Sequence, residues 1–435
     1  MRVIVPVEIL TRELDGRIWL ALNLLEEGHE VIIGKTPSID QSMDFFDPDI
    51  IFASSDHFRK YLNDFTGTAY LDMEGGIFSS RESYHNRITP EPVNSVQTFF
   101  AWGEIPAEIA EQSGCKNVVV SGNPRFDLLH DKLAEIYKSD AQQLRNKHGN
   151  FILLNTNFAR GNHENNPPID VPEVDKQISD LAGWHRYLCS EFVKIAKRID
   201  SEYQIPSVIV RPHPSENHDT YKRAFSDTDS IKVIHEGDVR NWISASKAVI
   251  HNSCTTGLES AILGTPTFAY LPEGNPYGSD LPNVVSHKTS HKSELLARVK
   301  QIAESGSGGE YRLDSSQKQE VKKYIHNVDC LSAPIISEAV SGMEPRTSNN
   351  FTPEIKERAR RILRYTLGDK NLMRLRETGV RESWTYLNQK FPYISTEEFR
   401  SHINKFDPFL EISTNSVNIT RIRQFENTFY LTQNS

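Results

Sequence analysis

The chain has 435 residues, 37% of them hydrophobic and 25% charged, a composition that is ordinary for a globular protein and a length that favours two domains with an appendage. Its 49 basic and 58 acidic residues give a net charge of −9, so the overall charge does not indicate a nucleic-acid partner. The cysteines form no CxxC pair, which argues against a disulfide framework or a structural zinc site; they are Cys115, Cys189, Cys254 and Cys330.

The N-terminal sequence Met-Arg-Val-Ile-Val-Pro is typical of a strand and not of a signal peptide. No apolar run reaches the roughly 20 residues that are needed to span a bilayer. Unpaired cysteines also suit a reducing compartment. We therefore expect a cytoplasmic protein, at most peripheral at the inner face of the cytoplasmic membrane.

Short apolar runs alternate with amphipathic stretches through the first part of the chain, as in a parallel, doubly wound sheet. A polar stretch, 8–16, predicts a loop before the first helix. A single long helix is predicted from the Gly122-Asn123-Pro124 turn to about His148. Strands are expected at 3–6, 31–33, 49–53, 69–71, 97–101 and 118–120, and further helices at 17–27, 57–63 and 105–112.

After Gly149-Asn150 the alternation restarts, with strands expected at 151–154, near Val208, Lys232 and Ala248, and at 267–270. The predicted domains are 1–150 (Rossmann-like, acceptor and catalytic), 151–305 (Rossmann-like, nucleotide-sugar) and a mainly helical extension, 306–435. Two such α/β domains facing a cleft resemble the GT-B architecture of glycosyltransferases, although a fold alone determines no activity.

Two polar motifs follow β-branched runs in the second domain. Arg211 to Pro214 (Arg-Pro-His-Pro) follows 208–210, and His251 to Ser260 follows 248–250. Residues just after parallel strands lie at the carboxyl edge of the sheet, where open α/β folds bind ligands. The prolines on both sides of His213 stiffen its backbone. Together the two motifs predict an anion site.

The second motif begins a predicted helix, and its first N–H groups and dipole attract a phosphate. Ser253 or Thr255 is expected as the N-cap, Thr256 lies beside them, and Gly257 would let a phosphate approach. Glu259, one turn further, is a candidate for a ribose or base hydroxyl, with a salt bridge as the alternative. Asn155, which ends the first strand of this domain, can line the same site.

The same stretch resembles a family. Arg211 to Pro214, then Asn252 to Glu259, then Gly264-Thr265-Pro266 are similar to the corresponding segments of bacterial capsule-type Kdo transferases, in a wider set with bacterial sialyltransferases and the glycerol- and ribitol-phosphate polymerases of teichoic acid synthesis. The resemblance implies a cytidine-nucleotide donor whose phosphate contacts His213 and the loop of Ser253, Thr255 and Thr256. It covers the stretch Val208 to Tyr270 and is topological elsewhere.

Leu71 to Gly76 resembles the acidic motif of those families, in which the carboxylate before the glycine is catalytic. That position is Glu74 here, but Met73 replaces the preceding acid, so Asp72 is a displaced second candidate. A carboxylate there would deprotonate the acceptor or attack the anomeric carbon. The alternative is a strand-end acid that caps the following loop.

Three further residues are candidates for the sugar carboxylate or the acceptor. Arg12 can form a bidentate pair with a carboxylate, Glu8 precedes it, and Arg125 follows the Gly122 turn. Arg125 can instead pair with Asp127. The acidic pairs 47–49 and 227–229 resemble metal-binding motifs but occur in turn contexts, so we expect no metal and no other cofactor. The basic segment 356–376 is either a solvated helix pair or a contact with an anionic membrane surface.

The resulting hypothesis is a metal-independent glycosyltransferase of surface polysaccharide synthesis. It would transfer Kdo or a related keto-acid sugar from its CMP ester to a glycan or lipid-linked glycan acceptor. A CDP-glycerol or CDP-ribitol phosphotransferase, a non-catalytic nucleotide-binding subunit and, less favoured, a nucleotide-sugar epimerase are the alternatives.

Overall fold

The computed structural model describes residues 1–36, 38–39, 45–53, 66–71, 81–88, 96–171, 180–202, 207–274, 280–304, 311–328, 330–346, 391–423 and 425–434. Their contacts divide them into two compact units. Unit 1 comprises the described residues up to Ile136 and those from Lys322 onward, and unit 2 comprises Tyr137–Val321. The sequence suggested boundaries near residues 150 and 305 instead. No helix among the described residues is both long and apolar enough to cross a membrane.

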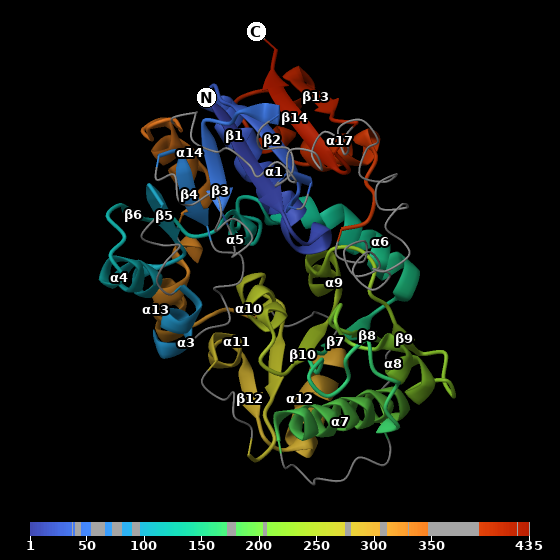
Figure 1. Cartoon of the computed structure of the whole chain (residues 1–435). Coiled ribbons are helices and arrows are strands. Elements are labelled where there is room, and N and C mark those ends of the chain that lie inside the picture. The colour runs from blue at the N-terminus through green and yellow to red at the C-terminus, as the bar shows by residue number, and fades with distance from the viewer. Residues whose placement is uncertain are drawn as a thin grey trace. The chain divides into compact units, whose positions relative to one another are not determined.

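The described strands of unit 1 form one sheet in the order β13-β14-β2-β1-β3-β4-β5-β6 (Figure 1). From β2 to β6 all pairings are parallel. The strands are β1 (Arg2–Val7), β2 (Glu30–Lys35), β3 (Ile50–Ala53), β4 (Thr68–Leu71), β5 (Thr98–Ala101), β6 (Val118–Val120), β13 (Val417–Arg421) and β14 (Thr428–Gln433). Residues of these strands such as Ile4, Ile32 and Phe52 are fully buried, which explains why the strands are continuous apolar runs in the sequence.

The described helices of unit 1 are α1 (Leu10–Glu26), α3 (Arg81–Ile88), α4 (Glu104–Gln112), α5 (Pro124–Asp127), α14 (Ser332–Ser341) and α17 (Thr396–Asn404). The short 3₁₀ turns are η6 (His326–Val328), η7 (Asp407–Phe409) and η8 (Thr414–Ser416). Two elements span the division between the units, η4 (Ala134–Tyr137) and α13 (Ser315–Tyr324).

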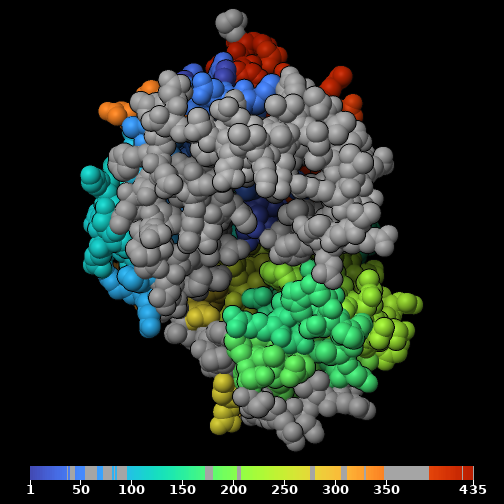
Figure 2. Space-filling model, in the orientation of Figure 1, coloured from blue at the N-terminus to red at the C-terminus, as the bar shows by residue number. Residues whose placement is uncertain are grey.

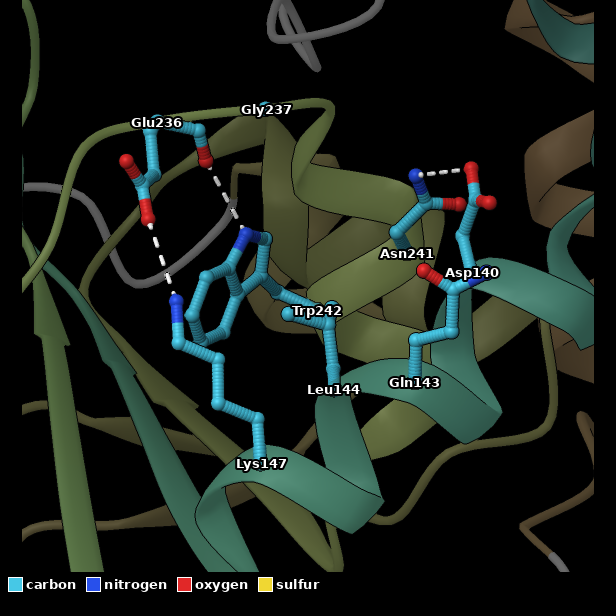
Figure 3. A pocket seen from close by; sticks show the side chains of 8 residues that line it. All are labelled: Asp140, Gln143, Leu144, Lys147, Glu236, Gly237, Asn241 and Trp242. Atoms are coloured by element: carbon cyan, nitrogen blue, oxygen red, sulfur yellow. Dashed lines mark hydrogen bonds and ion pairs between the residues drawn. The ribbon is translucent and has the colours of Figure 1, made fainter.

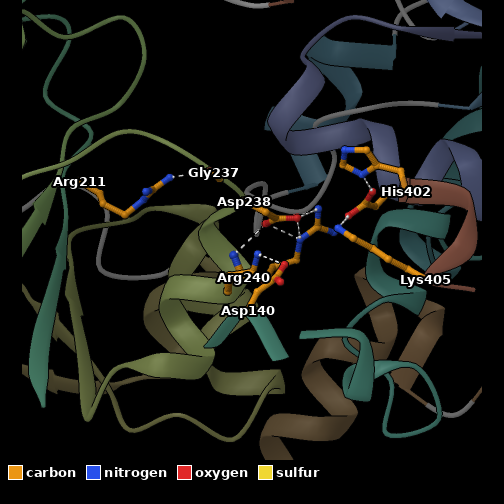
Figure 4. Close-up of polar contacts among 9 residues, drawn as sticks. Asp140, Arg211, Gly237, Asp238, Arg240, His402 and Lys405 are labelled. Carbon is orange, nitrogen blue, oxygen red and sulfur yellow. Dashed lines mark hydrogen bonds and ion pairs between the residues drawn. The ribbon is translucent and has the colours of Figure 1, made fainter. Parts of the chain in front are cut away.

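The predicted loop at 8–16 is wrong, because α1 begins at Leu10. Its polar residues Glu13 and Asp15 are buried but paired. Glu13 accepts the Glu8 N–H at 2.8 Å and binds Arg12, and Asp15 binds His402 and Lys405, the latter at 3.5 Å (Figure 4). Both lysine and histidine come from the C-terminal part of the chain, so no local pattern predicted their pairing with this helix.

The prediction of one long helix after Gly122 is also wrong. The chain forms the short α5, a series of turns, η4 and then α6 (Lys138–His148). Asp127, at the end of α5, is fully buried. It accepts N–H groups from Trp19 at 3.0 Å, Ser332 at 2.7 Å and Ala333 at 2.8 Å. Burial raises the pKa of Asp127 to about 7, although these donors favour the carboxylate form. The carboxyl group thus joins α5 to α1 and to the start of α14.

The described part of the mainly helical extension predicted from residue 306 contains α13, α14 and α17, but it also contains two strands that the sequence did not predict. After α17 it forms the hairpin β13–β14, and β14 pairs antiparallel with β2 at the edge of the unit 1 sheet. Phe429 and Leu431 are buried, and Phe429 stacks on Phe399 of α17 with ring centroids 4.0 Å apart. In Figure 2 the red C-terminal residues accordingly lie beside the blue N-terminal ones.

Unit 2 contains a parallel sheet in the order β12-β11-β10-β7-β8-β9. Its strands are β7 (Phe151–Asn155), β8 (Ser207–Arg211), β9 (Ile231–Val233), β10 (Ala248–His251), β11 (Thr267–Tyr270) and β12 (His287–Thr289). Its other described helices are α7 (Leu181–Glu202), α8 (His218–Ala224), α9 (Val239–Ala245), α10 (Thr255–Ile262), α11 (Leu281–Val284) and α12 (Lys292–Glu304).

Two apolar clusters cover the two faces of this sheet. One joins it to α7 and α12, and the other joins it to α6 and α9, where Trp242 packs on Phe151 at 5.9 Å between ring centroids. The chain passes from β7 to β8 on one side and later returns to β10 on the other. Strand order therefore reverses between β7 and β10, which is the point at which open α/β sheets bind ligands. The doubly wound parallel arrangement expected from the sequence is confirmed.

Candidate functional site

The predicted site residues of unit 2 gather at the carboxyl ends of β10, β7 and β8, which are neighbours in the sheet. Asn155 pairs with Arg211 across β7 and β8, and His251 lies one residue beyond the pair Ile250 and Leu154. The end of β7, the loop after β8 and the loop after β10 therefore lie along one edge of the sheet, on both sides of the reversal of strand order. Asn155 itself is buried, and its Nδ2 donates no hydrogen bond to the described residues.

Arg211 is turned toward the protein. Its guanidinium donates to the carbonyl oxygens of Glu236 at 2.7 Å and Gly237 at 3.0 Å (Figure 4), and it lies over the Trp242 ring, 5.3 Å from the ring centroid. Burial lowers the pKa of Arg211 to about 10, so it remains a cation at neutral pH. The arrangement ties the end of β8 to the loop after β9.

His213 is half-buried in the β8 loop, and several hydrogen bonds hold it. Its Nδ1 accepts the Ser215 N–H at 3.2 Å, so a neutral imidazole carries its proton on Nε2. Its carbonyl oxygen contacts His218 Nε2 at 3.3 Å. Its own N–H donates to Glu216 Oε1 at 2.9 Å. A neutral His213 ring is therefore a donor at Nε2.

Burial favours the neutral form of two neighbouring imidazoles. Burial, followed by the charge of Arg211, lowers the pKa of His235 to about 4, and its Nδ1 lies 2.8 Å from the Pro212 carbonyl oxygen. Burial also lowers the pKa of His218. At neutral pH an anion at this edge would therefore be bound by N–H and O–H donors, without imidazolium from these two residues.

Ser253 lies in the β10 loop with φ at +49°, in the left-handed region that non-glycine residues rarely adopt. Asn283 of α11 holds it there. Asn283 Oδ1 accepts the Ser253 N–H at 3.1 Å, and its Nδ2 donates to Ser253 Oγ at 2.7 Å. Since Oγ accepts from the amide, its own proton can go to a ligand. Asn283 is fully buried and was not identified in the sequence, where it lies in a different segment.

Helix α10 starts directly after this loop, at Thr255. Its N-cap is Cys254, and no side chain caps the helix. The prediction that Ser253 or Thr255 caps α10 is therefore wrong, because Thr255 is already the first residue of the helix and Ser253 bonds to Asn283 instead. Thr256 Oγ1 lies 3.0 Å from Cys254 Sγ. A helix start without a side-chain cap leaves its first N–H groups to an external acceptor.

Gly257 packs against a buried imidazole. A Cβ on Gly257 would lie 2.2 Å from Nε2 of His251. The same Nε2 lies 2.8 Å from Ser286 Oγ, which donates to the Pro282 carbonyl oxygen at 2.6 Å. His251 is fully buried, and burial lowers its pKa to about 3. The sequence assigned Gly257 to the approach of a phosphate, whereas the structure also requires glycine for the packing of α10 on β10.

Glu259 is buried within α10, and its charge acts on Arg240. Arg240, also buried, binds the N-cap Asp238 of α9 with Nη2 2.6 Å from Oδ2 (Figure 4). It also lies over the Tyr137 ring. The salt-bridge alternative for Glu259 is therefore consistent with its surroundings. Among the described residues no group of three His, Cys, Asp or Glu side chains is placed to hold a metal ion.

The remaining predicted residues lie elsewhere in the chain. In unit 1, Glu8 and Arg12 interact with Glu13 at the start of α1, and the Arg125 N–H donates to Asn123 Oδ1 at 2.9 Å at the start of α5. Their proposed role toward a sugar carboxylate stays a prediction. The candidate catalytic residues Asp72 and Glu74, and the basic segment 356–376, lie outside the described residues.

A separate pocket of about 260 Å³ lies between α6, α9 and the loop after β9 (Figure 3). Trp242 donates from Nε1 to the Glu236 carbonyl oxygen at 3.0 Å, and Asn241 donates to Asp140 at 3.0 Å. No residue predicted from the sequence lines it, but Arg211 holds one of its walls through Glu236 and Gly237. The lining residues are Asp140, Gln143, Leu144, Lys147, Glu236, Gly237, Asn241 and Trp242.

Comparison with known proteins identified no matching family model and no significantly similar curated protein. Solved structures do match. UDP-GlcNAc 2-epimerase from Methanocaldococcus jannaschii has 13% identity and a TM-score of 0.51, covering 78% of this chain and 99% of its own. The structure of the same enzyme in complex with UDP-GlcNAc and UDP has 14% identity and a TM-score of 0.50, and the match covers 79% of this chain and 100% of the enzyme. The chain has the GT-B fold.

The wall teichoic acid polymerase TagF also resembles the chain, with 11% identity over 79% of this chain and 88% of TagF, but its TM-score of 0.45 is too low to support an argument. The structural similarity to the epimerase shows the fold, whereas identities this low leave the activity open. The expectation of a GT-B architecture is confirmed.

Proposed function

We propose that the protein is a nucleotide-sugar-dependent glycosyltransferase of surface polysaccharide synthesis, with Kdo or a related keto-acid sugar transferred from its CMP ester. One observation supports it above the others. The His213 loop follows β8 and the uncapped start of α10 follows β10, and these two strands flank β7 at the reversal of strand order, where open α/β folds bind ligands.

In this proposal the donor phosphate accepts hydrogen bonds from His213 Nε2, from Ser253 Oγ and from the first N–H groups of α10 at Thr255 and Thr256. These donors stabilise the negative charge of CMP as it leaves, which is electrostatic catalysis by groups already in place. Glu74, with Asp72 beside it, would be the carboxylate that acts at the acceptor or at the anomeric carbon. Arg12 and Arg125 would bind the sugar carboxylate or the acceptor.

The first experiment is a thermal-shift panel of CMP, CDP, UDP and GDP on the wild type. We expect CMP to raise the melting temperature, since a ligand that binds only the folded state stabilises it. His213→Ala and Ser253→Ala should each remove most of the shift, while His291→Ala, at an exposed position in the same unit, should retain it. A shift with UDP alone would contradict a CMP donor, and unchanged shifts in His213→Ala would contradict the site.

A nucleotide-sugar epimerase is the second candidate, because the matching structure named above is an epimerase that binds UDP-GlcNAc and UDP. Incubation with UDP-GlcNAc separates the two: an epimerase changes the sugar without any acceptor, and a transferase requires one. A CDP-glycerol or CDP-ribitol phosphotransferase would be recognised by which cytidine ester is consumed, and a non-catalytic subunit by CMP binding without turnover.

A further inference from the structure

Glu216 occupies an unusual position in unit 2. It lies three residues after His213, its side chain is fully buried, and donors from three separate segments converge on it. Oε1 accepts the Thr156 hydroxyl at 2.6 Å and the His213 N–H at 2.9 Å, and Oε2 accepts the Tyr221 hydroxyl at 2.5 Å. Thr156 follows β7, His213 follows β8, and Tyr221 belongs to α8.

The loops after β7 and β8 are joined around this carboxyl group. The Thr156 N–H donates to the Arg211 carbonyl oxygen at 3.2 Å, and the Glu164 N–H donates to the Ser215 carbonyl oxygen at 3.0 Å. Asn162 adds three contacts: its carbonyl oxygen accepts the Asn217 N–H at 2.9 Å, its Nδ2 donates to the Asn217 carbonyl oxygen at 3.2 Å, and its Oδ1 accepts the Thr220 hydroxyl at 2.7 Å. Two loops far apart in sequence thus form one polar block.

His213 is the residue of this block to which the proposed function assigns chemistry, and Glu216 determines its backbone position. The Glu216 N–H in turn donates to the His213 carbonyl oxygen at 2.9 Å, closing a tight turn. Within that turn the Ser215 N–H reaches His213 Nδ1, and this bond selects the tautomer with the proton on Nε2. A carboxyl group that holds the turn therefore also determines which imidazole nitrogen donates.

We propose that Glu216 is a positioning residue that orients His213 and keeps its donor on Nε2, with Thr156 and Tyr221 holding the Glu216 carboxyl group in turn. The inference rests on the proposed function only for the role of His213 toward a phosphate. The orientation itself is a property of the protein without ligand, so it can be measured separately.

The test is ¹⁵N nuclear magnetic resonance of the histidine side chains in the full-length protein, with His213→Ala used to assign the His213 signals. The wild type should show an Nε2–H tautomer. Glu216→Ala should convert His213 to a mixture of tautomers and weaken CMP binding about tenfold or more, as expected for the loss of a hydrogen bond to a charged group. Glu216→Gln keeps an acceptor oxygen and should retain the tautomer, with affinity within about threefold.

Tyr270→Phe is a matched control. Tyr270 is a buried tyrosine of the same unit, and it donates to another buried carboxyl group, Glu191, at 3.1 Å. Tyr221→Phe should broaden or shift the His213 signals, whereas Tyr270→Phe should leave them unchanged. If Glu216→Ala does not fold, Thr156→Val and Tyr221→Phe decide the question, because each removes one donor to the same carboxyl group.

Unchanged His213 signals in Glu216→Ala, or in both Thr156→Val and Tyr221→Phe, would overturn the proposal. Equal impairment by Gln and Ala would also overturn it, because charge and not the acceptor geometry would then be decisive. If the wild type shows the Nε2–H tautomer and its loss in Glu216→Ala but binds neither CMP nor UDP, the positioning role stands and the proposed function fails.

Discussion

Gly257 and His251 are in direct contact, with the place of a Gly257 Cβ only 2.2 Å from the imidazole Nε2. His251 cannot move aside easily, because it is fully buried and its Nε2 contacts Ser286 Oγ at 2.8 Å. This contact packs the first turn of α10 directly against the end of β10. In the proposed function the same turn binds the donor phosphate.

Gly257→Ala should lower the free energy of unfolding by about 1–3 kcal/mol, as overpacking of a dense core does. Urea denaturation measures this. Gly342→Ala is the control, since its Cβ would lie at an ordinary 3.6 Å from the Ala339 carbonyl oxygen. A second substitution, His251→Ala, should recover part of the loss caused by Gly257→Ala. Equal stability of the two glycine variants would show that the contact is not restrictive.

Asn283→Ala should weaken binding of CMP about tenfold while leaving the protein folded. The substitution removes both hydrogen bonds that keep Ser253 at φ +49°, a conformation that costs roughly 1–3 kcal/mol and relaxes without support. Isothermal calorimetry measures the affinity. Asn146→Ala, an exposed amide that bonds to Gln142, should have no effect. If Asn283→Ala bound CMP as tightly as the wild type, the conformation of Ser253 would not contribute to CMP binding.

Acid should destabilise the protein from about pH 6.5 downward. Burial lowers the pKa of His251 to about 3, from an ordinary 6.5, so below 6.5 the unfolded chain binds a proton that the folded protein does not. The stability from neutral His251 is therefore present above pH 6.5 and is lost as the pH falls toward 3, at about 1.4 kcal/mol per pH unit.

Urea denaturation of the wild type and of His251→Asn, at several pH values between about 7.5 and 5, measures this dependence. The variant should show a flatter decline of unfolding free energy, whatever its stability at neutral pH. His291→Asn, at an exposed position, should decline as the wild type does. Parallel curves for wild type and His251→Asn would mean that His251 becomes protonated in the folded state.

Phe429→Ala should lower the free energy of unfolding by about 3–5 kcal/mol, the usual cost of removing a buried aromatic ring. Phe429 is buried in β14, and its ring stacks on that of Phe399 in α17 with centroids 4.0 Å apart. The ring therefore packs the hairpin against α17 within unit 1. Tyr393→Ala, at a residue that is 64% exposed, should cost less than about 1 kcal/mol. Similar costs for both would indicate that the C-terminal hairpin contributes little to the stability of the unit.

The sequence alone determined β1 to β11, which are parallel strands of the two sheets, and the placement of His213 and Ser253 after two of them. The reason is local: a buried parallel strand needs a short continuous apolar run, and the polar residues that follow must lie at its carboxyl end. Runs such as 151–154 and 248–250 therefore indicated strands without knowledge of their partners. The sequence did not identify β12 or the antiparallel hairpin β13–β14.

Only the tertiary structure decided where polar groups could be buried. Glu13 and Asp15 suggested a loop, yet α1 contains both, because Asp15 meets His402 and Lys405 from the other end of the chain. Glu216 and Asn283 gave no signal for the same reason. Glu216 accepts a hydrogen bond from Thr156, and Asn283 binds Ser253, and in each case the partner comes from another segment of the chain. A buried polar side chain is stable only with its partner, and that partner is set by the fold.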